Sequence, residues 1–93
     1  MKSLIKYISE QKGDIIDDQW IQDENPVMTK NGYDVKITDV DISVYPNVIT
    51  GNVYLPNNVI ATYKWTDDGN CIQAADNIGN PKQPDENDAL VKK

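Results

Sequence analysis

The chain has 93 residues, with 15 Asp and Glu against nine Lys, no His, and a net charge of −6 at pH 7. This length predicts one domain with a thin core, because a chain of this size buries only about 60–65% of its unfolded surface. The negative charge disfavours direct binding to nucleic acid and to anionic membranes, since both require clustered Lys or Arg. We therefore expect a protein partner with a basic surface. The simpler alternative is that the acidity serves solubility alone.

The single cysteine, Cys71, excludes an intramolecular disulfide and does not indicate an oxidising compartment. Apolar residues at the amino terminus are too scattered for a secretory signal, and no run approaches the ~18 apolar residues of a membrane-spanning helix. We therefore expect a cytoplasmic protein.

Two short helices are expected before the first strand. The first runs over residues 3–12, with Gly13 after its last turn. The second lies within residues 14–21, with Asp14 as its N-cap. The alternative for the second segment is irregular structure with Trp20 folded onto the core.

A first β-hairpin is expected from residues 27–30 and 33–38, which flank the dipeptide Asn31-Gly32. This dipeptide is preferred in turns where both central residues have positive φ. The apolar alternation then slips by one residue at Thr38-Asp39. Because such a slip would turn every later side chain to the other face, we expect a β-bulge or kink near Asp39. The apolar residues before the slip are Tyr33, Val35 and Ile37, and those after it are Val40, Ile42 and Val44.

The strongest signal in the chain is a central hairpin of residues 49–55 and 59–65, joined by Pro56-Asn57-Asn58. Apolar side chains alternate along both strands and predict one buried face. Tyr63 and Trp65 lie on that face. We expect them in the core, packed under the first helix, and the alternative is a platform for a ligand.

A loop over residues 66–70 and a short returning strand over 71–74 are expected next. The segment from 76 to 93 is polar and contains few apolar residues, so we expect it to be a flexible tail. Weak docking of its Ala89-Leu90-Val91 run is the alternative. The predicted fold is therefore α+β: one or two short helices packed on a mostly antiparallel meander of about five strands within residues 1–75, followed by a disordered tail.

Catalysis, metals and cofactors are not expected. Without His there is no imidazole base, and Cys71 has no base to activate it. One Cys cannot fill a zinc site, and the acidic pairs do not match the twelve-residue calcium loop. The Asp-Asp-Gly-Asn run at 67–70 is ordinary turn chemistry.

The expected function is non-enzymatic protein binding through acidic side chains. Its sharpest form is an intracellular inhibitor, encoded by a phage or mobile element, that mimics DNA and occupies a basic surface of a nuclease or defence protein. The alternative is an assembly protein that self-associates through strand edges or exposed tyrosines. The predicted protein-binding residues are Asp14, Asp17, Asp18, Asp23, Glu24, Asp39, Asp41, Tyr45 and Tyr54.

Overall fold

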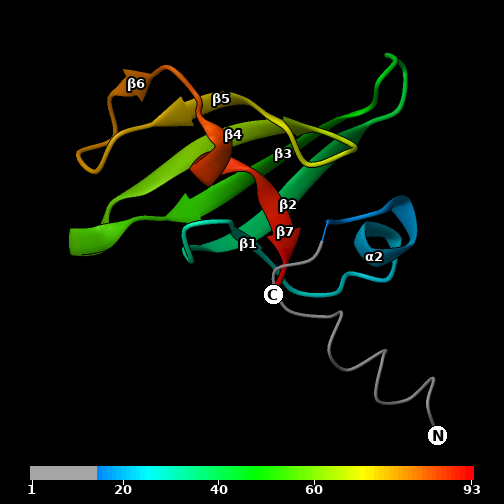
Figure 1. Cartoon of the computed structure of the whole chain (residues 1–93), viewed down its shortest axis with the longest axis horizontal. Helices are drawn as coiled ribbons and strands as arrows, with labels where there is room; N and C mark the ends of the chain where they lie inside the picture. Colours follow the sequence, from blue (N-terminus) through cyan, green and yellow to red (C-terminus); the bar gives the residue numbers. More distant parts are fainter. Residues whose placement is uncertain (1–14) are drawn as a thin grey trace, which may run out of the picture.

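A computed structural model of the chain describes residues 15–93 as a seven-stranded antiparallel sheet in the order β6-β5-β4-β3-β2-β1-β7. The sheet curls into a half-barrel, and one short helix lies beside the strands at one edge (Figure 1). The elements are α2 (Asp18–Gln22), β1 (Val27–Thr29), β2 (Asp34–Asp41), β3 (Val48–Tyr54), the 3₁₀ turn η1 (Pro56–Asn58), β4 (Ile60–Thr66), β5 (Cys71–Ala75), β6 (Pro81–Lys82), the 3₁₀ turn η2 (Glu86–Asp88) and β7 (Leu90–Lys92).

The central hairpin is confirmed. Strands β3 and β4 pair in register from Val48 opposite Thr66 to Tyr54 opposite Ile60. Alternate side chains of both strands are buried, as the alternation of apolar residues predicts. Gly51 allows a close approach at the centre of the sheet, because an added Cβ would lie 2.8 Å from the carbonyl oxygen of Lys36.

The hairpin of β1 and β2 is also confirmed, but its turn differs from the expectation. Of Asn31 and Gly32, only Gly32 has positive φ, at 101°. The amide of Gly32 donates to the carbonyl of Thr29, and the Thr29 hydroxyl accepts a hydrogen bond from the Tyr33 amide. These bonds close the turn without a second residue in the left-handed region, so the prediction for Asn31 was wrong.

The predicted bulge lies where the apolar alternation slips. Ile37 pairs with Gly51 and Asp39 with Thr50, so Thr38 is the extra residue. The shift returns Val40 to the face of the sheet that carries the core, opposite Ile49. Ile42, beyond the end of β2, stays 78% exposed, because no described element covers it.

The short helix before β1 is confirmed, but it begins at Asp18 and its N-cap is Asp17 rather than Asp14. The Asp17 carboxylate accepts from the Trp20 amide at 2.8 Å. The half-buried Trp20 indole then donates to the carbonyl of Pro26 at 2.8 Å. The helix predicted over residues 3–12, like Asp14, lies outside the described residues. In the part of the chain that the structure describes, no helix has both the length and the apolar character needed to cross a membrane.

The expected disordered tail, and with it the expected fold of helices on about five strands, is wrong. The segment forms β6, η2 and β7, and β7 pairs with β1 along its whole length. Leu90 is only 1% exposed and Val91 7% exposed. Few apolar residues suffice here because Leu90 and Val91 are both buried and neighbouring polar groups are hydrogen-bonded. The Leu90 amide, for example, donates to the Gly69 carbonyl at 2.9 Å.

Tyr63 and Trp65 are core residues, as predicted, but the hydrogen-bond partner of Trp65 comes from the carboxy-terminal segment and that of Tyr63 from the end of β5. The Trp65 indole donates to the Asp88 carbonyl at 2.8 Å, and the Tyr63 hydroxyl donates to the Ala75 carbonyl at 2.6 Å. The buried Asp88 carboxylate lies 3.1 Å from Lys82 Nζ and also accepts from the Asp85 amide at 2.9 Å. Both aromatic side chains can therefore be buried without an unpaired polar atom.

Truncation of Leu90 measures whether the carboxy-terminal segment is part of the folded domain. We expect Leu90→Ala to lower the free energy of unfolding by about 2–5 kcal/mol, the range for emptying a buried leucine site. Urea unfolding followed by tryptophan fluorescence measures this change. Ile78→Ala is the matched control, because Ile78 is 74% exposed and should change stability by less than about 0.5 kcal/mol. Equal unfolding midpoints for the two variants would contradict the docked segment.

Candidate functional site: an acidic hollow and a free strand edge

Strand β2 is longer than its neighbour β1, which pairs only with Asp34 and Val35. Residues 36–41 of β2 therefore have no strand partner on that side among the described residues. Their outward backbone groups are available for pairing with another strand, which makes this stretch a free edge.

The edge stays open because the chain before β1 is held away from it. Glu24 has a left-handed backbone, with φ of 56°. The Asn25 amide donates to the Trp20 carbonyl at 3.2 Å, and the Trp20 indole holds the carbonyl of Pro26. Pro26 itself has no amide hydrogen for a strand ladder. These contacts turn the backbone toward α2, and pairing with β2 begins only at Val27.

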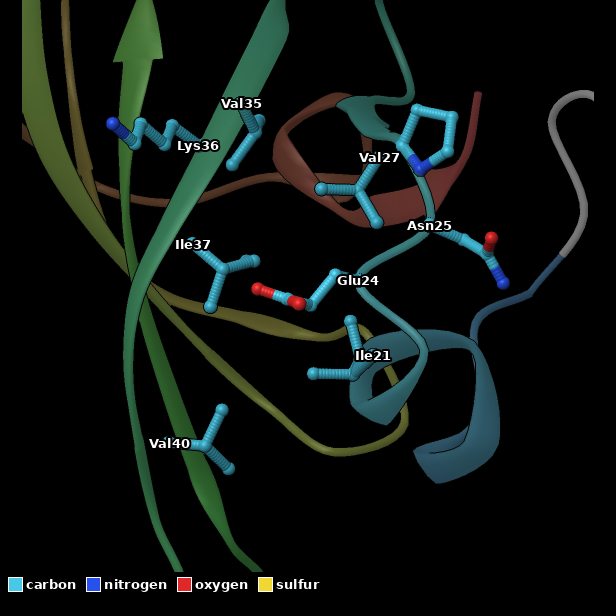
Figure 2. A pocket seen from close by; sticks show the side chains of 9 residues that line it. Ile21, Glu24, Asn25, Val27, Val35, Lys36, Ile37 and Val40 are labelled. Carbon is cyan, nitrogen blue, oxygen red and sulfur yellow. The ribbon is translucent and has the colours of Figure 1, made fainter.

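A groove of about 340 Å³ lies between this free edge and α2. We call it the edge groove. Figure 2 shows Ile21 of α2 on one wall and Ile37 on the other, with the Glu24 carboxylate pointing across the groove toward Ile37. The Lys36 side chain points away from it, and so does that of Asn25 (Figure 2). The groove is lined by Ile21, Glu24, Asn25, Pro26, Val27, Val35, Lys36, Ile37 and Val40.

A second hollow of about 250 Å³ adjoins the far end of β2. We call it the acidic hollow. Its floor is apolar, and Asp67 from the loop between β4 and β5 is part of its wall. Asp23 follows the lining residue Gln22 directly in sequence, and Asp68 follows Asp67. The hollow is lined by Ile21, Gln22, Val40, Ile42, Asn47, Ile49 and Asp67, with no lysine among them.

The predicted acidic residues do not share one face. Glu24 faces the core side of β2, in the edge groove. Asp39 and Asp41 pair with Thr50 and Val48 and belong to the opposite, outer face of the sheet. Of the other predicted residues, Asp17 and Asp18 are the N-cap and first residue of α2, Asp23 is its C-cap, and Asp14 lies outside the described residues.

The two predicted tyrosines are exposed but lie far apart. Tyr45 is 96% exposed and precedes β3, whereas Tyr54 is 43% exposed and ends it. The strand between them spans about 20 Å at ~3.3 Å per residue. The two rings therefore cannot form one contact patch.

The sequence reading missed two features of this site. Asp67 is distant in sequence from the other predicted acidic residues. It was interpreted as a turn residue, and that interpretation gave no indication that it lines the hollow. The free edge of β2 was not predicted. It exists because β1 is short, and the length of β1 depends on the tertiary contacts of Trp20. A Pro at residue 26 was the one available signal, since proline ends strand pairing.

Local hydrogen bonds stabilise the ionised form of two carboxylates that lie outside the linings of the edge groove and the acidic hollow. Bonds from the Ser43 side chain and then its backbone lower the pKa of Asp41 below its usual value. Bonds from the Thr66 side chain and the Asn70 backbone lower the pKa of Asp68 in the same way. Both carboxylates therefore remain ionised under mildly acidic conditions. Within residues 15–93, no group of three or more His, Cys, Asp or Glu side chains is arranged to hold a metal ion.

Cys71, the one thiol of the chain, is poorly suited to nucleophilic chemistry. Burial raises its pKa to about 11, outweighing the opposing hydrogen bond to the Gln73 backbone. The thiol is therefore protonated at neutral pH, whereas a nucleophilic cysteine requires the thiolate.

The reactivity of Cys71 tests this environment. We expect iodoacetamide to alkylate the folded protein at pH 8 at least tenfold more slowly than the urea-unfolded chain, because the thiolate fraction falls about tenfold per unit of pKa. The rate for the folded protein should rise with pH up to about 11. Because the pKa is higher in the folded state, stability should also fall as the pH rises above about 9. Equal rates in the two states would contradict the raised pKa.

Comparison of the chain with protein-family models, with curated proteins and with solved structures finds no match. A functional assignment therefore depends on the geometry and charge of these two surfaces.

Proposed function

We propose that this protein is a non-enzymatic binding module that contacts a basic surface of a partner protein through the acidic hollow. The observation that carries the proposal is an apolar floor, formed by Val40, Ile42 and Ile49, next to Asp67. Asp23 follows the lining residue Gln22 in sequence. An apolar centre with a charged rim is the usual anatomy of a protein interface.

The distribution of lysines supports the same proposal. Lys82, Lys92 and Lys93 lie within ion-pair distance of carboxylates elsewhere in the fold. No lysine lines the acidic hollow, so the carboxylate of Asp67 is not neutralised by a cation in its wall. A potential of one sign in a concave surface attracts a ligand of the opposite sign.

The proposal extends to the kind of partner and its compartment. Proteins that handle nucleic acids have large basic surfaces, and a nuclease or defence protein inhibited in this way is the sharpest form of the proposal. We also infer a cytoplasmic location, because the single cysteine cannot form an internal disulfide and its thiol is partly buried.

Capture experiments with charge variants test this function. The immobilised protein is exposed to an extract of cells in which its gene is expressed, and bound proteins are identified by mass spectrometry. We expect a basic partner that elutes between 0.1 and 1 M NaCl, because the screening length falls from about 10 Å to about 3 Å over this range. Asp23→Asn/Asp67→Asn should weaken binding of the identified partner about 2- to 30-fold, as expected for two exposed charge pairs.

Asp39→Asn/Glu86→Gln is the matched control, because it removes the same charge from the outer face of β2 and from η2. It should bind as the unmodified protein does. If both double variants lose the same amount of binding affinity, the interaction depends on net charge alone. If only the control variant loses affinity, the binding site lies near Asp39 or Glu86 and not at the acidic hollow.

A further inference from the structure

We propose that the free edge of β2 pairs with the same edge of a second copy of this chain. The two strands would run antiparallel about a two-fold axis that passes between Thr38 and Asp39. This inference goes beyond the proposed function and does not depend on it, because it uses residues 36–41 and the edge groove rather than the carboxylates of the acidic hollow.

The sequence of the edge is complementary to itself in this register. Lys36 of one copy lies opposite Asp41 of the other, and Ile37 lies opposite Val40. The faces agree as well. Lys36 and Asp41 both belong to the outer face, because they pair with Asn52 and Val48 of β3.

Ile37 and Val40 both belong to the core face, where they pair with Gly51 and Ile49 of β3. Because of the two-fold axis, each favourable pair occurs twice in the dimer. Opposite charges and apolar side chains directly across from each other stabilise antiparallel strands.

The bulge favours a second copy over an ordinary strand. Thr38 is an extra residue on β2, so a regular strand laid along the edge would lose register there. Bulges protect strand edges from unwanted pairing in this way. A second copy carries the same extra residue, and the two-fold axis places Thr38 of each copy beside the axis, opposite Asp39 of the other. The irregularity of one edge therefore matches the irregularity of the other.

The edge groove also accommodates the pairing. Ile37 and Val40 line it together with Ile21 and Val35, and Val40 is still 37% exposed. In the dimer the core-face side chains of the second β2 would enter this space, which the Glu24 carboxylate also lines. Pairing would also satisfy the outward backbone groups of both edges, which have no strand partner among the residues described.

Charge reversal at the edge tests the register. The mass of the full chain in solution is measured by light scattering and sedimentation between about 10 µM and 1 mM, the range for a weak interface. We expect concentration-dependent dimers. Lys36→Asp alone and Asp41→Lys alone should each weaken dimerisation on the order of tenfold or more, because like charges would then lie opposite each other twice.

Two combinations should restore the dimer. The double variant Lys36→Asp/Asp41→Lys recovers both charge pairs within each homodimer. An equimolar mixture of the two single variants recovers them as a heterodimer, because one copy then carries Asp at both positions and the other carries Lys at both. Lys64→Asp and Glu86→Lys are the matched controls for net charge, since they make the same changes on β4 and η2, and both should dimerise normally.

Amide hydrogen exchange provides a measurement that needs no variant. Exchange of the outward amides of residues 36–41 should slow as the concentration of the unmodified protein rises, while the amides of β5, which β3 and β4 separate from β2, should not change. A monomer at 1 mM, dimers unaffected by either single reversal, or failure of both restored combinations would each overturn the proposal.

Discussion

The hydrogen bond from the Trp65 indole to the Asp88 carbonyl joins the centre of the sheet to the end of the chain, 23 residues later. Trp65 is completely buried, so its N–H needs a partner inside the protein. Losing that partner would cost about 1–3 kcal/mol, a large part of the stability of a domain this small. The carboxylate of Asp88 is itself fixed by Lys82 and by the Asp85 amide. Burial of the central aromatic pair and order in the carboxy-terminal segment therefore depend on each other.

The carboxy-terminal segment also affects the surface next to β2. Strand β7 pairs with β1, and β1 in turn reaches only the first two residues of β2. Trp20 holds the chain before β1 through the carbonyl of Pro26, while the side-chain amine of Lys92 lies 4.9 Å from the centre of its ring. The edge of β2 is left free by these contacts, and the edge groove is the space that remains between them. The packing of the core and the shape of this surface therefore depend on the same contacts.

Features that depend on interactions between residues close in sequence were predictable, whereas features that depend on distant residues were not. The central hairpin and the bulge at Thr38 were predictable because alternation and turn residues act over a few positions. The acidic character of the site was predictable from composition. The sharing of one hollow by Asp67 and Gln22 was not, because it depends on where the fold places α2 and the loop between β4 and β5. The split of Glu24 and Asp39 onto opposite faces of β2 likewise depends on tertiary position.

By itself, the sequence determined the first five strands, their hairpins, the buried face and the net negative charge. Each of these depends on side-chain periodicity, on turn residues or on a sum over residues. Only the tertiary structure decided that the polar carboxy-terminal segment is ordered and that β1 ends early. Leu90 and Asp88 are held by hydrogen bonds to residues distant in sequence. The Leu90 amide donates to the Gly69 carbonyl, and the Asp88 carbonyl accepts from the Trp65 indole. Local composition contains no information on such bonds, since they form only when the chain has folded.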